Sequence, residues 1–273
     1  MPVSDAVDRE DATDREDALP INELFTSLQG EGKLAGVPSV FVRTSGCNLR
    51  CWFCDSYHTS WEPTHAWMDL ESILAEVESS DATHVVVTGG EPLLHETVVD
   101  LLSALDDRGY HVTVETNGTI YRDAPIDLAS ISPKLESSTP TPERDPRSEI
   151  SEDSPNGRRR PEGAVNRGEW ADRHERDRID LETLARLVES FDFQLKFVVT
   201  DADDVPEIVD LLERLRAVAS EPIRDEDVLL MPEGATRERL AETRSRVADL
   251  ALEYGFRYTP RLHVDLWNDA PET

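Results

Sequence analysis

Short runs of residues that favour strands alternate with amphipathic segments along most of this chain, and this alternation restricts its fold more than any other feature. Six runs are predicted to be strands: Ser39–Arg43, His84–Thr88, His111–Glu115, Leu128–Ile131, Phe193–Val199 and Val228–Leu230. Five helices are predicted, near residues 69–79, 93–108, 180–190, 203–218 and 236–254. Such alternation gives an α/β fold with right-handed crossovers. Because six strands are too few for a closed eight-stranded barrel, we expect a partial, open β/α barrel with a mostly parallel sheet.

Two segments interrupt this pattern. Residues 1–19 are acidic and almost free of large apolar side chains, which predicts a disordered arm. Residues 136–178 contain five prolines and a run of three arginines, which predicts a mobile insertion. Trp170 and His174, near the end of this insertion, are expected to fold back onto the body. Residues 20–273 are expected to form a single domain that carries the insertion.

The formal net charge of −29 restricts the partners of the chain. Nucleic acids and anionic membrane surfaces attract basic patches, so we expect neither as a partner. The acidity has two explanations: adaptation to a high-salt (halophilic) setting, where surface carboxylates stay hydrated, or acidic tails on an ordinary domain. The sequence lacks an apolar run of about 20 residues and a signal-peptide core, which predicts a cytoplasmic protein.

The chain has only three cysteines, Cys47, Cys51 and Cys54, and they lie within eight residues. An odd number of cysteines at this spacing argues against a disulfide framework and favours a metal site. A loop of this kind can hold a [4Fe–4S] cluster, which normally takes four cysteines. Three thiolates leave one iron open, and an open position is where a catalytic metal binds its substrate or cofactor.

Two other interpretations of the cysteines remain open. A structural zinc site would need a fourth ligand, and His58 lies close enough in sequence to supply it. An iron–sulfur electron carrier would use the same three thiolates without any catalysis.

Further motifs follow the predicted strands directly. Gly89-Gly90-Glu91 comes after one strand, Thr116-Asn117-Gly118 after the next, and Ser132-Pro133-Lys134 after a third. Because the carboxyl ends of parallel strands share one side of a sheet, these segments are expected to meet the cysteine loop in one pocket.

These motifs resemble those of the radical S-adenosylmethionine (SAM) superfamily, and the wider sequence narrows the resemblance to the 7-carboxy-7-deazaguanine synthase family. The residues that carry it are Ser27–Gly32, Val40–Arg43, the cysteine loop with Asp55-Ser56, Thr88–Pro92, Glu115–Thr119, Ser132–Lys134 and Lys196–Val199. The resemblance covers about residues 21–134 and 191–265. The segment Tyr258–Val264 resembles the last strand of the family.

The resemblance implies a fold of the radical SAM type and a carbon–nitrogen lyase. Such an enzyme uses a [4Fe–4S] cluster, SAM and Mg²⁺ to convert 6-carboxy-5,6,7,8-tetrahydropterin to 7-carboxy-7-deazaguanine with loss of ammonia. The product is a precursor of modified tRNA bases of the queuosine or archaeosine type. The resemblance also implies an electron donor such as a ferredoxin or flavodoxin, and a homodimer.

The resemblance assigns roles residue by residue. The cluster ligands are Cys47, Cys51 and Cys54, and the Mg²⁺ ligand is Ser56, where the family often has threonine. The SAM-binding residues are Gly89, Gly90, Glu91, Glu115, Asn117, Ser132, Pro133 and Lys134. The pterin-binding residues are Leu28, Gln29, Gly30, Arg43 and Thr88.

An alternative radical SAM function is an activase that installs a glycyl radical on a partner protein. It would share the cysteine loop and the Gly89-Gly90-Glu91 turn. Ser27–Gly32 and Arg43 argue against it, because a small carboxylated substrate needs them and a protein substrate does not.

Overall fold

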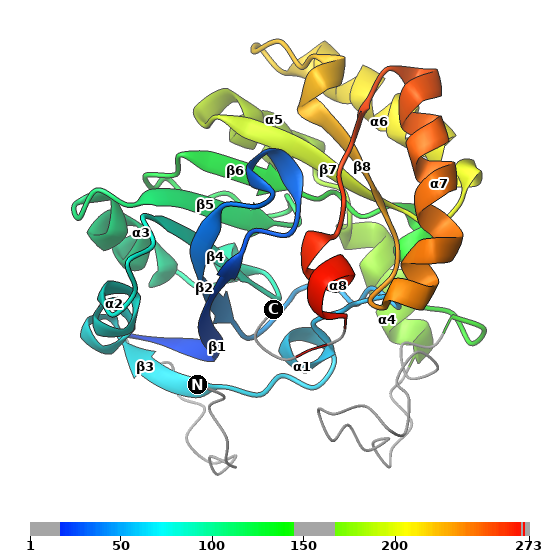
Figure 1. Ribbon diagram of the computed structural model, residues 1–273. Coiled ribbons are helices and arrows are strands. Elements are labelled where there is room, and N and C mark those ends of the chain that lie inside the picture. The colour runs from blue at the N-terminus through cyan, green and yellow to red at the C-terminus, as the bar shows by residue number, and fades with distance from the viewer. Residues whose placement is uncertain (1–16, 145–166, 269, 271–273) are drawn as a thin grey trace.

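Nine strands form one sheet in the computed structural model, which describes residues 17–144, 167–268 and 270 (Figure 1). Their spatial order is β3 (Ala66–Asp69), β1 (Ala18–Leu28), β2 (Pro38–Thr44), β4 (His84–Gly89), β5 (His111–Thr116), β6 (Leu128–Ile131), β7 (Phe193–Val199), β8 (Val228–Pro232) and β9 (Arg257–Tyr258). β1 runs antiparallel to its two neighbours, and all other pairs are parallel. In the described part of the chain β3 and β9 are edges that do not pair with each other, so the predicted open, mostly parallel α/β fold is confirmed.

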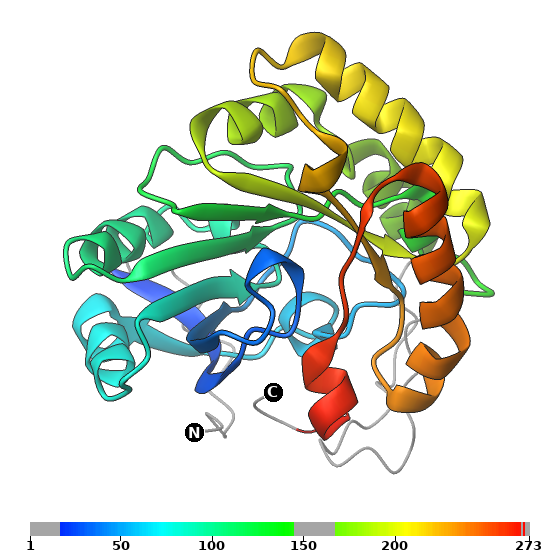
Figure 2. The ribbon, with the colours of Figure 1, turned by 45° about the horizontal axis from the view of Figure 1, so that its top comes forward.

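Five helices wrap around the outer face of the sheet (Figures 1 and 2). They are α2 (Leu70–Glu78), α3 (Val98–Asp106), α5 (Leu181–Ser190), α6 (Val205–Val218) and α7 (Arg237–Tyr254). Three others lie in the lower part of Figure 1: α1 (Tyr57–Ser60), α4 (Arg167–Asp177) and α8 (Leu262–Trp267). None of the helices within the described ranges combines the length and apolar character needed to cross a membrane.

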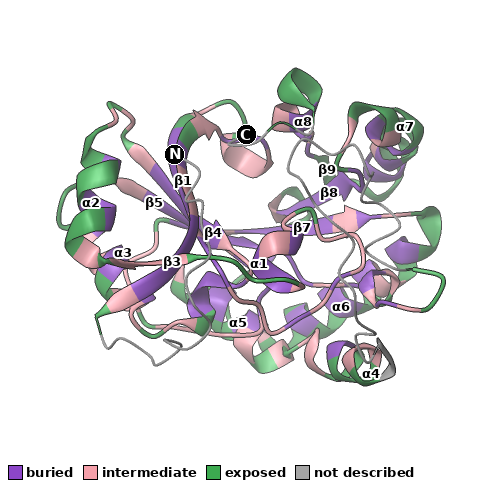
Figure 3. Ribbon diagram, turned by 90° about the horizontal axis from the view of Figure 1, so that it is seen from below, coloured by how far each residue is buried: buried purple, intermediate pink, exposed green. Residues whose placement is uncertain are grey.

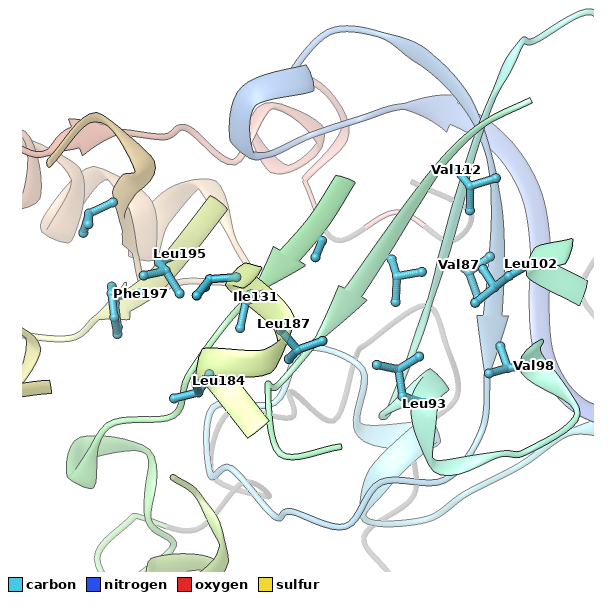
Figure 4. Close-up of a cluster of buried hydrophobic side chains, with 14 of the residues drawn as sticks. Val87, Leu93, Val98, Leu102, Val112, Ile131, Leu184, Leu187, Leu195 and Phe197 are labelled. Carbon is cyan, nitrogen blue, oxygen red and sulfur yellow. The ribbon is translucent and has the colours of Figure 1, made fainter. Parts of the chain in front are cut away.

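The main core lies between the sheet and these outer helices. Strand residues Val87, Val112 and Leu195 belong to one hydrophobic cluster with Leu102 of α3 and Leu187 of α5, and all five side chains are fully buried (Figure 4). Successive side chains of a strand point to opposite faces, so Val86 belongs instead to a small second cluster with Phe25 and Phe41. Figure 3 shows buried strands in the middle and exposed residues on the outer surface of the helices. The inner face of the sheet is thereby left for the site.

All six predicted strands and five predicted helices are present. Their ends agree within two residues, except near 93–108, where a 3₁₀ turn at Pro92–Leu94 precedes the shorter α3. The prediction missed β1, β3 and β9, and also α1, α4 and α8. β1 was missed because Asn22 and Glu23 interrupt its apolar residues, as is common in an antiparallel strand with one partly exposed face.

The interrupting segments are partly described. Residues 1–16 lie outside the described residues, while β1 begins at Ala18, inside the predicted arm. The predicted insertion holds a 3₁₀ turn at Glu136–Ser138 and α4, and its residues 145–166 lie outside the described residues. The expectation of a last strand over Tyr258–Val264 was wrong, because β9 ends at Tyr258 and α8 begins at Leu262. Pro260 lacks the N–H that a longer strand would need.

Candidate active site

The segments that follow the parallel strands line a cavity of about 340 Å³. The predicted site residues that line it are Leu28, Gln29, Gly30, Arg43, Cys47, Cys51, Cys54, Ser56, Thr88, Gly89, Gly90, Glu115, Asn117, Ser132 and Lys134. Glu91 and Pro133 belong to the same turns but do not line the cavity. The structure therefore brings together residues that lie up to about a hundred positions apart, as the strand-end argument predicts.

The cysteine loop leaves β2 through a tight contact with the Gly89-Gly90 turn. Gly46 donates its N–H to Thr59 O (2.8 Å) and accepts from the N–H of Glu91 (2.8 Å). A Cβ atom on Gly90 would lie 2.2 Å from Gly46 O, so only glycine permits this approach. On the far side of the loop, Trp61 donates its Nε1–H to Cys51 O (2.9 Å). The loop is thus held at Gly46, directly before Cys47, and at the carbonyl of Cys51.

The three thiols suit an iron–sulfur cluster. Burial raises the pKa of Cys47 and Cys51 to about 12 and also raises that of Cys54, so the thiolates need a metal charge in order to form. Within the described ranges, no three His, Cys, Asp or Glu side chains converge as ligands of a single metal ion. A cuboidal cluster does not require this, because each thiolate binds a different iron.

A hydrogen-bonded turn connects the cysteine loop with the end of β5. Asn117 donates its Nδ2–H to Asn48 Oδ1 (2.9 Å), and Asn48 donates to Thr119 Oγ1 (2.8 Å). Asn117 N–H and Thr116 Oγ1–H in turn donate to the fully buried Glu91 carboxylate, at 2.7 and 2.9 Å. Burial raises the pKa of Glu91 to about 7, although these hydrogen bonds lower it in part. Glu91 therefore ties the glycine turn to the Thr116-Asn117 turn and does not line the cavity.

The turn after β6 contributes an ammonium group to the cavity. Lys134 Nζ donates to Ser132 Oγ (2.7 Å), and Ser132 N–H donates to Thr116 O (2.8 Å). Pro133 separates these two polar side chains and sets the backbone between them. The pair offers a cation and a hydroxyl to an anionic or ribose group in the cavity.

A second group of polar side chains lines the cavity around Glu115. Glu115 accepts from Thr88 Oγ1–H (2.9 Å) and from Gln29 Nε2–H (3.3 Å). Glu115 was predicted with the SAM residues, but its contacts place it between two residues predicted for the pterin. Gly30, beside Gln29, has no room for a side chain because a Cβ would lie 1.9 Å from the ring of His263. Amide, hydroxyl and carboxylate groups together match the donors and acceptors of a flat heterocycle.

Arg43 and Ser56 lie next to each other in the cavity. Arg43 Nη1–H donates to Ser56 Oγ (2.9 Å), and Arg43 Nε forms an ion pair with Glu23 (2.9 Å). Burial raises the pKa of Glu23, but His58 and Arg43 lower it more. Ser56 Oγ–H donates to Asp55 Oδ1 (3.2 Å). A guanidinium, a hydroxyl and a carboxylate thus share one corner of the site.

Three charged residues of the site were missed. Lys196 Nζ lies 2.5 Å from Glu31 Oε2, and Arg261 Nε lies 3.0 Å from Glu31 Oε1. Arg261 also pairs with Asp55 and donates to Gly234 O (2.7 Å). Burial raises the pKa of Glu31, but the charges of Lys196 and Arg261 lower it more, to about 2. Lys196 and Arg261 lie in two of the segments that carry the resemblance, Lys196–Val199 and Tyr258–Val264, but neither was assigned a role.

Comparison with known proteins agrees with this geometry. The model of the Radical SAM superfamily matches residues 41–134, which include the cysteine loop and the strand-end turns. The chain is also similar to solved QueE from Escherichia coli, with a TM-score of 0.60 and 23% identity over 90% of this chain and 95% of that one. This second likeness supports the fold.

Two curated relatives extend over most of the chain. One, the 7-carboxy-7-deazaguanine synthase of Halobacterium salinarum, is 62% identical over 100% of both chains. Another, of the same name from Rhodopirellula baltica, is 39% identical over 90% of this chain and 86% of its own length. This chain therefore belongs to the 7-carboxy-7-deazaguanine synthase family of the radical SAM superfamily.

Proposed function

We propose that this chain is a radical SAM lyase that converts 6-carboxy-5,6,7,8-tetrahydropterin to 7-carboxy-7-deazaguanine with loss of ammonia. The observation that carries the proposal is the shared cavity, which joins the three cysteines, the glycine turn and the Gln29–Glu115–Thr88 group. Relatives that span the whole chain and bear the name of this activity support it. When bound, the cluster and SAM supply a reactive radical, while the protein orients the reactants and excludes side reactions.

Four segments of the chain would bind the cluster and SAM. Cys47, Cys51 and Cys54 would hold the cluster. Gly89 and Gly90 present bare backbone to SAM, and Asn117, Ser132 and Lys134 offer hydrogen-bond donors and a positive charge. Glu91 accepts hydrogen bonds from Thr116 and Asn117, so its role would be to hold the Thr116-Asn117 turn in place.

The pterin would lie on the opposite wall. We assign the ring edge to Leu28, Gln29, Gly30, Thr88 and Glu115, where a carboxylate can accept from the amino and ring N–H groups of a pterin. The substrate carboxylate would pair with the guanidinium of Arg43, which lines the cavity and is held there by its ion pair with Glu23 and its hydrogen bond to Ser56.

Arg43→Gln is expected to raise the KM for the carboxypterin by about 10- to 100-fold, because a hydrogen bond to a charged group contributes about 1.5–3 kcal/mol. Reductive SAM cleavage without substrate should stay near the wild-type rate. Steady-state kinetics under anaerobic conditions would measure both quantities. An unchanged KM would contradict the assignment of Arg43 to the carboxylate.

Mg²⁺ would bind at Ser56, with substrate oxygens and water completing its shell. Magnesium prefers oxygen ligands, and the Ser56 hydroxyl lies beside the Asp55 carboxylate in the cavity. We expect Ser56→Ala to lose most of the stimulation of turnover by Mg²⁺ while keeping its iron content. Ser56→Thr is the matched control and should keep the stimulation. A Ser56→Ala protein that responds to Mg²⁺ like the wild type would argue against this site.

We propose a ferredoxin or flavodoxin as the electron donor, a homodimer as the assembly and the cytoplasm as the location. The product would enter the synthesis of queuosine or archaeosine in tRNA. The net charge of −29 supports a high-salt host.

The test of the function is an anaerobic incubation of the reconstituted protein with SAM, a reductant, Mg²⁺ and the carboxytetrahydropterin. About four irons per chain, as the cluster requires, and a deazaguanine product are expected. SAM cleavage with no change in the pterin would contradict the proposal and favour an activase. Zinc in place of iron, or an iron centre that leaves SAM intact, would also contradict it.

A further inference from the structure

The helix α4 contacts the cysteine loop through His174, a residue that the function above does not use. The imidazole is fully buried, with 0% of its surface exposed. Its Nδ1 atom lies 3.1 Å from the backbone nitrogen of Arg50, and its Nε2 atom lies 2.8 Å from Ser138 Oγ. Both ring nitrogens therefore have a partner at hydrogen-bonding distance.

These partners determine the state of the ring. A backbone N–H only donates, so Nδ1 of His174 accepts from Arg50, and a neutral ring then carries its proton on Nε2. Nε2–H donates to Ser138 Oγ, whose own hydrogen goes to Leu135 O (2.6 Å). Burial lowers the pKa of His174 to about 4, which agrees with the neutral form. The hydrogen bonds therefore run in one direction, from the N–H of Arg50 through the His174 ring and the Ser138 hydroxyl to Leu135 O.

The two hydrogen-bond partners of His174 are connected to the residues on either side of Cys51. Arg50 precedes Cys51 in the loop. Ser138 accepts through its carbonyl oxygen from the N–H of Trp52 (3.1 Å), the residue that follows Cys51. His174 thus joins the residues on either side of a single cluster ligand.

The rest of α4 and the residue after it keep the imidazole in place. Trp170 packs under the guanidinium of Arg50, with the Arg50 Cζ atom 4.2 Å from the ring centroid. Arg178, which follows α4, donates to Lys134 O (3.0 Å) and pairs with Glu207 of α6 (2.6 Å). These contacts attach α4 to both the cysteine loop and the segment proposed to bind SAM.

We propose that His174 is a positioning residue of the iron–sulfur site, which holds the Cys51 corner of the loop through the Arg50 amide and Ser138. The proposal rests on the proposed function, because it assumes that the loop carries a cluster. Residues that support metal ligands from behind typically change metal affinity or activity by about 10- to 100-fold when they are removed.

Two substitutions separate the hydrogen bonds from simple packing. His174→Leu fills the space without polar atoms, whereas His174→Asn places an amide oxygen near the position of Nδ1, where it can still accept from Arg50. Asp172→Ala, an exposed position on the same helix, is the control. After anaerobic reconstitution, the measurements are the rate at which a chelator removes iron, the electron paramagnetic resonance spectrum of the reduced cluster and its reduction potential.

We expect His174→Leu to lose iron about 10- to 100-fold faster than the wild type, with an altered spectrum and a shifted potential. His174→Asn should recover most of the wild-type retention, and Asp172→Ala should match the wild type. Equal iron loss and identical spectra in wild type and His174→Leu would overturn the proposal. If His174→Leu does not fold, His174→Asn decides: iron retention near that of the wild type supports a role for the acceptor, and iron loss about 10-fold or more faster than in the wild type refutes it.

A wild-type protein that takes up no iron would instead refute the proposed function, and this inference with it. If the wild type converts the pterin and only His174→Leu loses its cluster, the proposed function stands and the result concerns His174 alone.

Discussion

Gly90→Ala is expected to lower the rate of SAM cleavage by about 10²-fold or more, because the new methyl group would push the cysteine loop out of place. The added Cβ would lie 2.2 Å from Gly46 O, 2.7 Å from Gly46 C and 2.9 Å from Cys47 Cβ. Two of these atoms belong to the backbone, so relief requires a shift of about 1 Å in the loop, and shifts of this size cost about 10²-fold in rate. Iron content after reconstitution should fall as well.

Gly109→Ala is the matched control for this change. A Cβ at Gly109 meets nothing within 4 Å, so only its left-handed backbone, with φ of 76°, opposes the substitution. That strain costs about 1–2 kcal/mol of stability. The control should therefore unfold at a slightly lower temperature but retain its iron and its rate. Full iron content and a normal rate in Gly90→Ala would show that the loop tolerates the displacement.

Arg261→Leu is expected to destabilise the protein by about 1.5–3 kcal/mol at pH 7, because it removes a charged hydrogen-bond partner from the buried carboxylate of Glu31. Lys196 remains as a partner of Glu31, and Asp55, the other partner of Arg261, has a side chain that is 47% exposed and can be solvated by water instead. For a chain of this size, the melting temperature should fall by about 3–12 °C. Thermal unfolding followed by circular dichroism would measure this.

The loss should depend on pH in a defined direction. The pKa of Glu31 is lowered to about 2 in the folded protein, and that of Asp55 is also lowered because Arg261 outweighs the effect of burial. Carboxylates with a lowered pKa stabilise the fold above their unfolded pKa values near 4, and lose this contribution as the pH falls towards 2. The gap between wild type and Arg261→Leu should therefore be full at pH 7 and shrink below about pH 5.

Arg246→Leu provides the comparison at the surface. Its ion pair with Asp201 is about as short, at 2.7 Å, but both side chains are more than half exposed. Exposed pairs contribute about 0–1 kcal/mol, so this variant should stay close to the wild type at every pH. Equal destabilisation by the two substitutions would show that burial of the Arg261 network adds nothing.

The sequence predicted the parts of the site that depend on local spacing. A cluster needs its thiolates within one short loop, and bare backbone needs adjacent glycines, so Cys47–Cys54 and Gly89-Gly90 are visible without a structure. The six central strands were also predicted, because each is a short run of residues that favour strands and contains buried apolar side chains.

The missed parts depend on contacts between distant segments. Arg261 meets Glu31 across 230 positions, and His174, which was expected to fold back but without a named partner, meets Arg50 across 124. No spacing rule connects such residues, and α4 itself is strongly polar, so its helical character gave little apolar periodicity to detect. Glu115 shows the same limit, since its partner Gln29 follows β1 and its partner Thr88 lies in β4.

The position of α8 has a consequence for the order in which parts of the cavity form during synthesis. Leu262 donates its N–H to Gly30 O (2.8 Å), and the His263 ring fills the space over Gly30, so α8 closes the cavity beside Gln29. The cysteine loop leaves the ribosome about two hundred residues earlier. A growing chain therefore exposes its three cysteines well before α8 can cover them.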